Sequence, residues 1–323
     1  MLVPFQALLD AQHRLEPHLT PTPVKRSAWL SARTGAEVWL KLEVFQPTGS
    51  FKVRGALNRV LAMPPALRAK GVVTASGGNH GLGVATAAKL AGASALVVLP
   101  ENSPQLRRDA IAALGAEVRV HGPVWNEANA LALQLAEERG ATYISPFDHV
   151  MIMAGQGTIG VELIDQLPEV DVVVASVGGG GLIGGIASAM RHLKPQVRVI
   201  GVETEGAACM TRAVEAGRVV ELERFDSIAD SLGTRKTAER PLAIVQEAVE
   251  QMVTVSDRSA TEALLGLLDH DKLLVEPAAS ITASALLEGL VPELQGKTVA
   301  LVMCGGNITL EHALGWRARF GLG

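Results

Sequence analysis

The chain has 323 residues, of which 48% are hydrophobic, 19% are charged and 3% are aromatic. So much apolar sequence excludes a disordered protein, and the length suggests two domains. The 29 basic and 33 acidic residues give a net charge of −4, so there is no basic excess with which to bind a nucleic-acid backbone.

Three features of the sequence predict a cytoplasmic protein. No apolar stretch reaches the roughly 18 residues that a membrane span needs. Asp10 and Arg14 interrupt any apolar targeting segment near the N-terminus. The two cysteines, Cys209 and Cys304, lie far apart in the sequence, which is typical of free thiols in a reducing compartment. We therefore expect neither a membrane nor a nucleic acid as a partner.

From about residue 70 onward, short β-branched runs alternate with helical stretches. The first series consists of expected strands at 71–75, 95–99, 117–120 and 142–144 and expected helices at 79–91, 103–114 and 126–139. Such strand–helix units predict a compact parallel α/β module.

A second series follows a crossing segment at 145–148. It consists of expected strands at 170–177, 197–202 and 298–303 and expected helices at 182–193, 242–249, 260–269 and 278–287. Ligand sites in open parallel sheets lie beyond the carboxyl ends of the strands. Glycine clusters after Ala75, Val177 and Met303 therefore mark the candidate site.

The tetraglycine run at 178–181 follows an apolar strand and precedes a helix. Free backbone amides and a helix N-terminus bind a phosphate without a basic side chain. The run also fits a dinucleotide fingerprint, Gly179-x-Gly181-x-x-Gly184, with Glu203 where a ribose-binding acid is expected. The motif therefore predicts a phosphate and leaves an NAD(P)-dependent oxidoreductase open.

Lys52 lies between Gly49-Ser50-Phe51 and Gly55-Ala56, where small residues allow a ligand to approach closely. A lysine kept neutral by burial or by a nearby cation attacks a carbonyl and forms a Schiff base. A phosphate site together with such a lysine is the least that a binding site for pyridoxal phosphate requires.

The chain resembles the fold-type II pyridoxal-phosphate enzymes, and among them the serine/threonine dehydratase group. The motifs that carry the resemblance are Ser50-Phe51-Lys52-x-Arg54-Gly55-Ala56, Ser76-Gly77-Gly78-Asn79-His80-Gly81, Pro146-Phe147-Asp148, Gly155-Gln156-Gly157-Thr158, the tetraglycine run, Gly201-Val202-Glu203 and Cys304-Gly305-Gly306-Asn307. The resemblance implies an α/β fold with two open, twisted, mostly parallel sheets flanked by helices. It also implies a homodimer, and a small domain at 70–147 inserted into a large domain at 1–69 and 148–323.

The resemblance also assigns roles to individual residues. Lys52 holds the cofactor and removes the α-proton of the substrate, while Phe51 packs near the cofactor ring. Asn79 donates a hydrogen bond to the phenolic oxygen O3′, and Cys304 faces the pyridine nitrogen. The expected phosphate-binding residues are Gly178, Gly179, Gly180, Gly181 and Leu182.

The loop from Ser76 to His80 is expected to hold the substrate carboxylate, with Ser76, Gly77, Asn79 and His80 as its binding residues. For His80, a purely structural role is equally consistent with the sequence. Related serine racemases carry a second serine at the position of Gly77, and that serine protonates the opposite face of the carbanion. Glycine offers no acid there, which favours elimination over racemisation.

Two further positions bear on the site. Some relatives bind a divalent cation through a glutamate matching Glu203 and an aspartate a few residues later. That aspartate is missing here, so we expect no metal, although Glu203 and Glu205 leave Mg²⁺ or Ca²⁺ open. Asp230-Ser231 departs from the Asp-Gly sequence of better-known dehydratases, which leaves the preferred substrate open.

The sequence therefore predicts a pyridoxal-phosphate-dependent ammonia-lyase. It would convert a small β-hydroxy amino acid, such as L-threonine or L-serine, into a 2-oxo acid and ammonia. A racemase or a β-replacement enzyme of the same fold is the first alternative. An NAD(P)-dependent oxidoreductase and a non-catalytic pyridoxal-phosphate-binding regulator are the others.

Overall fold

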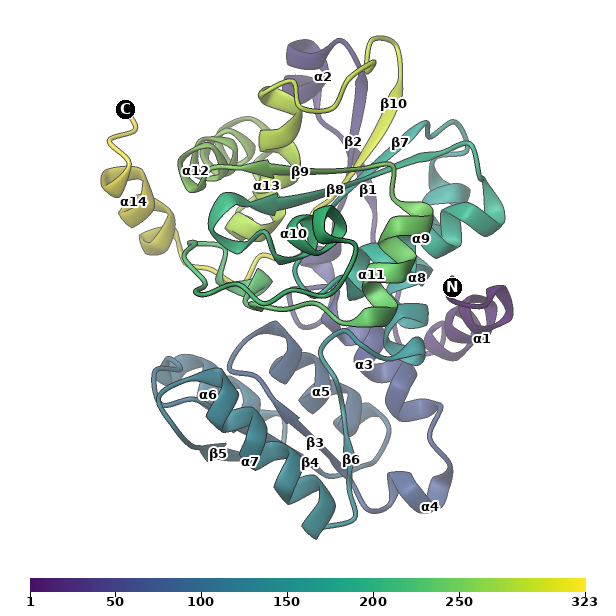
Figure 1. The fold of residues 1–323 in the computed structure, drawn as a ribbon, viewed down its shortest axis with the longest axis vertical. Coiled ribbons are helices and arrows are strands. Elements are labelled where there is room, and N and C mark those ends of the chain that lie inside the picture. Colours follow the sequence, from purple (N-terminus) through teal and green to yellow (C-terminus); the bar gives the residue numbers. More distant parts are fainter.

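The computed structural model describes residues 1–323 and distributes the strands over two sheets. In Figure 1 the six-stranded sheet occupies the upper part of the molecule and the four-stranded sheet the lower part. No helix is both long and apolar enough to cross a membrane.

The six-stranded sheet has the order β1-β2-β10-β7-β8-β9. All neighbours are parallel except β1 and β2, which pair antiparallel. Its strands are β1 (Val24–Arg26), β2 (Glu37–Lys41), β7 (Val172–Ser176), β8 (Arg198–Thr204), β9 (Gln251–Val255) and β10 (Thr298–Val302).

Helices surround this sheet on both faces (Figure 1). The α-helices are α1 (Phe5–Leu15), α2 (Ala28–Thr34), α3 (Lys52–Leu61), α8 (Val150–Gln166), α9 (Gly181–Leu193), α10 (Cys209–Ala216), α11 (Glu239–Ala248), α12 (Asp257–Gly266), α13 (Pro277–Leu287) and α14 (Leu310–Arg319). Shorter turns of other helix types are η1 (Glu43–Phe45), η2 (Glu205–Ala207), η3 (Asp230–Leu232) and the π-helix η4 (Leu267–Asp271).

The four-stranded sheet is wholly parallel and has the order β5-β4-β3-β6. Its strands are β3 (Val72–Ala75), β4 (Ala95–Leu99), β5 (Glu117–Val120) and β6 (Thr142–Tyr143). The helices of this part of the chain are α4 (Pro65–Arg68), α5 (Asn79–Leu90), α6 (Gln105–Ala113) and α7 (Trp125–Glu138).

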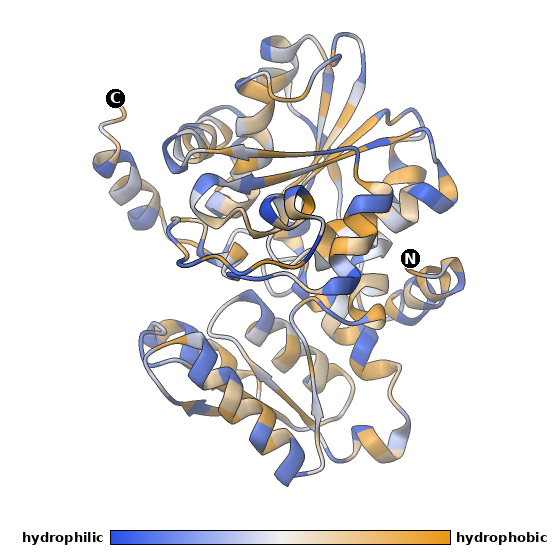
Figure 2. Cartoon of the chain, in the orientation of Figure 1, coloured by the Kyte–Doolittle hydropathy of each residue, from blue (hydrophilic) through white to orange (hydrophobic).

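The central strands of both sheets are buried on both faces. In β7, Val172 to Ala175 are fully buried, as are Val299 to Val302 in β10. Burying a valine or leucine side chain stabilises the fold by about 1.5–3 kcal/mol. Because both faces of these strands are covered, every side chain is buried and the strand is a continuous apolar run in the sequence. Figure 2 shows the hydrophobic colour along these strands, while α7 alternates between hydrophobic and hydrophilic residues.

Three helices approach one another closely through glycines. A β-carbon on Gly155 of α8 would lie 2.6 Å from the Gly55 Cα of α3. On the other side of α8, a β-carbon on Gly157 would lie 2.8 Å from the Gly185 carbonyl oxygen of α9. Side chains at these positions would push the helices apart. The packing therefore fixes α3, which begins at Lys52, against α8.

The fold confirms the predicted α/β class with two mostly parallel sheets flanked by helices. Most expected elements occur with ends shifted by a few residues; the helix expected at 260–269, for example, begins at Asp257 and becomes a π-helix at Leu267. The elements before residue 70, helices α8, α10 and α14 and strand β9 were not predicted. All four strands of the smaller sheet come from one continuous segment. The domain limits at 70 and 147 stay a prediction, because α3 shares a hydrophobic core with α5.

Candidate active site

Lys52 lies where the two sheets meet. The backbone amide of Phe51 donates to the Cys304 carbonyl oxygen at 3.0 Å, so this segment runs beside the end of β10. From the other side, a β-carbon on Gly83 of α5 would lie 3.1 Å from the Lys52 carbonyl carbon. The first turn of α3 is therefore held between the two parts of the molecule.

The Lys52 side chain is partly buried and its amino group contacts the protein. Its Nζ donates to the Pro146 carbonyl oxygen at 3.1 Å and lies 5.1 Å from the centre of the Phe51 ring. Burial lowers the pKa of Lys52 from 10.5 to about 8, against the opposing effect of Cys304 and Glu276. A lysine with such a pKa has a substantial neutral fraction near neutral pH and can act as a nucleophile or a base.

The tetraglycine run presents free backbone amides at the start of α9. The backbone amides from Gly178 to Ile183 donate no hydrogen bond to another protein group. Gly180 has φ +92°, a conformation that favours glycine. The Phe147 ring lies against Gly179, so a side chain there would overlap it. Because Pro146 contacts Lys52, the Pro146-Phe147 segment joins the lysine to the glycine run.

Cys304 follows β10, next to the end of β7. Its Sγ accepts a hydrogen bond from Ser176 Oγ at 3.4 Å, and Ser176 lies two residues before the glycine run. Burial raises the pKa of Cys304 to about 12. At physiological pH this residue is therefore a neutral thiol.

Glu276 connects several parts of the site, and the sequence analysis missed it. Its carboxylate accepts hydrogen bonds from Asn79 Nδ2 at 2.9 and 3.0 Å, from Ser231 Oγ at 2.6 Å and from the Asn307 amide at 2.9 Å. Asn307 Nδ2 in turn donates to Asn79 Oδ1 at 2.7 Å. Burial raises the pKa of Glu276 despite these donors. A lone acid in the apolar run before Pro277 was the available signal.

The Ser76–His80 loop leads into α5. The amides of Gly77, Asn79 and His80 donate no hydrogen bond within the protein, whereas the Gly78 amide donates to Ser76 Oγ at 3.2 Å. The His80 imidazole is buried beside the Ile144 carbonyl oxygen, with Nε2 at 3.1 Å, and burial lowers its pKa to about 3. The backbone of this loop is thus free to bind an anion, while the His80 side chain is held by the protein.

Glu203 caps a helix in this structure. Its carboxylate accepts hydrogen bonds from the amides of Met210 and Thr211 at 2.9 and 2.7 Å. Burial raises its pKa to about 7. Glu205, the other candidate for a cation, is exposed, and no three His, Cys, Asp or Glu side chains are grouped so that they could hold a metal ion.

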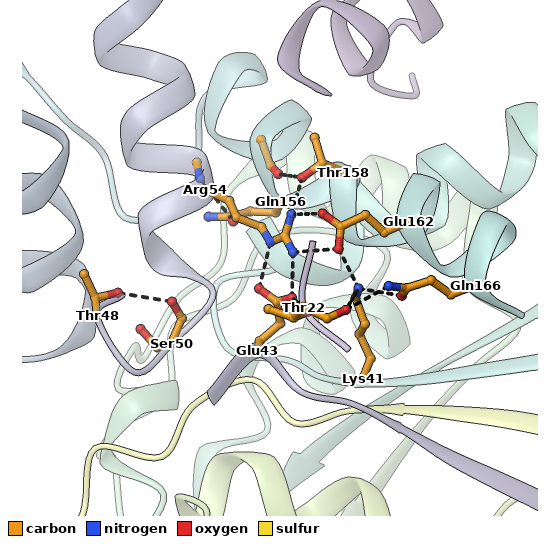
Figure 3. Close-up of polar contacts among 12 residues, drawn as sticks. Thr22, Lys41, Glu43, Thr48, Ser50, Arg54, Gln156, Thr158, Glu162 and Gln166 are labelled. Atoms are coloured by element: carbon orange, nitrogen blue, oxygen red, sulfur yellow. Dashed lines mark hydrogen bonds and ion pairs between the residues drawn. The ribbon is translucent and has the colours of Figure 1, made fainter. Parts of the chain in front are cut away.

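A buried network of charges lies two residues beyond Lys52, around Arg54 (Figure 3). The Arg54 guanidinium donates to Glu43 at 2.7 and 2.8 Å and also to Glu162 and Thr158. Lys41 joins the network through Glu162. Arg54, Lys41 and Glu43 are almost fully buried. The network ties the first turn of α3 to the end of β2 and to α8.

Residues 15–305 match the sequence profile of the family described as pyridoxal-phosphate dependent enzymes. The chain belongs to this family. It is 40% identical over 310 residues to an L-threonine ammonia-lyase of Geobacter sulfurreducens, covering 96% of this chain and 77% of that protein.

Two solved structures of the same fold cover almost the whole chain. The processed form of threonine deaminase isoform 2 from Solanum lycopersicum matches with a TM-score of 0.94 at 33% identity, over 98% of this chain and 93% of that one. A serine racemase from maize matches with a TM-score of 0.92 at 30% identity, over 98% and 96%. The resemblance that the sequence predicted is confirmed, and pyridoxal phosphate is the cofactor of this family.

The residues present fit this cofactor. Ser50 Oγ, two residues before Lys52, is buried without a hydrogen-bond partner, so its donor remains for a bound group. The free amides at 178–183 suit a phosphate, and the neutral thiol of Cys304 suits an unprotonated ring nitrogen. The individual roles that the sequence assigned to residues of the site all stay predictions: Lys52, Phe51, Asn79, Gly178, Gly179, Gly180, Gly181, Leu182, Cys304, Ser76, Gly77 and His80.

Proposed function

We propose that the protein is a pyridoxal-phosphate-dependent ammonia-lyase for a small β-hydroxy amino acid such as L-threonine or L-serine. It would convert this substrate into a 2-oxo acid and ammonia. The observation that carries the proposal is the position of Lys52, a partly buried lysine with a pKa of about 8, between the free amides of the glycine run and the loop at 76–80. The threonine ammonia-lyase relative supports this choice of reaction.

In this proposal each part of the site has one task. The bound cofactor supplies an electron sink for the electrons of the substrate Cα–H bond. The amides of Gly178 to Gly181 and Leu182 would hold its phosphate, and the thiol of Cys304 would face its ring nitrogen. Phe51 would pack near the ring, and Asn79, held by Glu276, would donate to the phenolic oxygen.

The substrate lies between the loop at 76–80 and Lys52. The free amides of Gly77, Asn79 and His80, together with Ser76, bind its carboxylate. Lys52 Nζ takes the α-proton, because it is the one basic nitrogen enclosed at this point of the site. The His80 imidazole acts by fixing the loop to Ile144 rather than by moving a proton.

A visible absorption spectrum and a product assay test the proposal. The purified protein should be yellow, and Lys52→Ala should abolish the band. The wild type should release a 2-oxo acid from L-threonine or L-serine. A colourless protein that does not change on addition of pyridoxal phosphate would contradict it.

Other products in the same assay identify the alternatives. Formation of the D-amino acid without 2-oxo acid would indicate a racemase, and incorporation of an added nucleophile would indicate a β-replacement enzyme. A yellow protein without turnover would indicate a regulator. Reduction of NAD(P)⁺ would indicate an oxidoreductase.

We further propose a homodimer in the cytoplasm. Large apolar side chains are exposed at Phe45 of η1 (60%) and at Leu310 and Leu314 of α14 (52% and 47%), and a second copy would cover such surfaces. The thiol of Cys304 has to stay reduced for its proposed role. Sedimentation should give twice the chain mass, and Phe45→Glu should shift the protein toward the monomer.

A further inference from the structure

The space beside Gly77 is occupied by a hydroxyl from another segment. A β-carbon on Gly77 would overlap Ser103 Oγ and would lie 3.1 Å from Ser103 Cβ. Ser103 lies between β4 and α6, where its amide donates to the Pro100 carbonyl oxygen at 3.0 Å. A side chain at position 77 would therefore have to displace the Ser103 hydroxyl, which occupies that space.

The Ser103 hydroxyl has no partner in the protein. Ser103 is 8% exposed, yet its Oγ makes no hydrogen bond with another protein group, although its carbonyl oxygen accepts one from Arg108 Nε at 2.9 Å. Ser50 Oγ is the one fully buried side-chain polar atom without a partner, so the Ser103 hydroxyl keeps some contact with solvent. Its donor is therefore available to a bound group.

The surroundings of this hydroxyl favour an anionic ligand. It adjoins the N-terminus of α5, where the amides of Gly77, Asn79 and His80 are free. The Arg107 guanidinium is also near, since its Nη1 would lie 3.8 Å from a β-carbon on Gly78. Asp230, which faces Arg107 at 3.4 Å, is the acidic group at this point and is more than half exposed.

We propose that Ser103 is a substrate-binding residue that donates a hydrogen bond to the substrate carboxylate together with the free amides of the loop. In this chain the second hydroxyl of the carboxylate site comes from residue 103 instead of residue 77. The inference rests on the proposed function, because it concerns the same site. It adds a residue that lies outside every motif of the sequence analysis.

The test measures binding to the cofactor-loaded protein with L-alanine, an amino acid without a β-leaving group. L-Alanine binding is titrated through the change in the visible absorption band. Ser103→Ala should raise the Kd for L-alanine about tenfold, which is the loss expected for one hydrogen bond to a charged group. The band of the free holoenzyme should stay unchanged, because Ser103 does not hold the cofactor.

A double variant gives the sharper result. Gly77→Ser should weaken binding, because the new side chain and Ser103 compete for one space. Gly77→Ser combined with Ser103→Ala removes this overlap and supplies a hydroxyl from position 77. The double variant should therefore bind L-alanine more tightly than either single variant, which independent sites would not show.

Ser94→Ala is a matched control, since Ser94 Oγ fills the space beside Gly71 in the same way at the opposite end of β3. It should leave the Kd unchanged. The inference would be overturned if Ser103→Ala bound L-alanine with the Kd of the wild type, or if the effects of the two substitutions were additive in the double variant. In either case, 2-oxo acid release by the wild type would still support the proposed function. A wild type that takes up the cofactor but does not bind L-alanine would overturn both.

Discussion

At the scale of single residues, the carboxylate of Glu276 links three segments that are far apart in sequence. It accepts hydrogen bonds from Asn79 at the start of α5, from Ser231 of η3 and from Asn307, which follows β10. All of these partners are donors, so a carboxylate satisfies them and a neutral amide would not. Burial and hydrogen bonding thus act in opposite directions on its pKa, and burial dominates.

Replacing Glu276 should slow turnover through Asn79. Glu276→Ala leaves the Asn79 amide without its anchor, so we expect kcat to fall about 10- to 100-fold, with a shift of the visible band. Glu276→Gln should fall less, since one oxygen remains. Steady-state kinetics and absorption spectra of the two variants check this prediction. If Glu276→Ala were as active as the wild type, the carboxylate would have no role in turnover.

The lowered pKa of Lys52 has a measurable pH dependence in the cofactor-free protein. The neutral amine reacts with pyridoxal phosphate, so the rate of band formation should rise with pH and level off above about pH 8. Between pH 8 and the ordinary pKa of 10.5, the unfolded chain binds more protons than the folded one, and the stability of this form should rise with pH. A rate that keeps rising toward pH 10.5 would show an unperturbed lysine.

At the scale of elements, the start of α3 is fixed by packing on one face and by charge on another. Glycines allow α8 to approach α3, and the buried guanidinium of Arg54 ties α3 to η1 and α8. A buried ion network stabilises little relative to an apolar core, but removing one member leaves the others unpaired. The network therefore fixes the positions of α3, η1 and α8 relative to one another.

Breaking this network should destabilise the protein strongly. Arg54→Met leaves the buried Glu43 carboxylate without its ion-pair partner and Glu162 with Lys41 alone, and should lower the free energy of unfolding by about 3–5 kcal/mol. Thr158→Val removes the hydrogen bond from Arg54 and the one to the Gly155 carbonyl oxygen and should cost about 1–3 kcal/mol. Arg258→Ala, which breaks an exposed pair with Glu262, is the control and should change it by less than about 0.5 kcal/mol. Urea unfolding measures all three; equal effects of Arg54→Met and Arg258→Ala would contradict this account.

The sequence was informative where local pattern decides the structure. Strands such as 172–176 are continuous apolar runs, and the glycine run precedes its helix as predicted. Helix α8 was missed because Gly155, Gly157 and Gly160 weaken a helical pattern, and only the neighbouring helices explain them. Glu276 was missed because its hydrogen-bond partners lie in other segments, and its one sequence signal, an acid in an apolar run, does not name them. Ser103 was missed because its contact with Gly77 joins two separate segments.

At the scale of the whole molecule, the site lies between the two sheets, and few polar contacts cross directly from one side to the other. Asn79 reaches Glu276, and Arg107 of α6 faces Asp230 of η3 at 3.4 Å. Arg107 and Asp230 are partly exposed, at 31% and 57%. Such a pair contributes little to stability, but it lies beside the loop expected to bind substrate.

Removing the Arg107 side chain should affect binding and not folding. Arg107→Ala should raise KM about threefold by weakening the positive potential near the 76–80 loop, while the free energy of unfolding changes by less than about 0.5 kcal/mol. Arg212→Ala, which breaks an exposed pair with Glu215 away from the loop, should leave KM unchanged. A KM for Arg107→Ala equal to that of the wild type would show that this charge does not reach the substrate.

The strand order also has a consequence for synthesis of the protein. Strand β2, which precedes Lys52, pairs only with β1 and with β10, so it joins the large sheet only after residue 302 has been translated. At about 5–20 residues per second, the ribosome needs tens of seconds to bridge this interval. During that time the apolar strands at 172–176 and 198–204 are already synthesised, but β10, which lies between β2 and β7 in the sheet, is missing. Nascent chains stalled before residue 298 should therefore engage chaperones and fail to retain the cofactor.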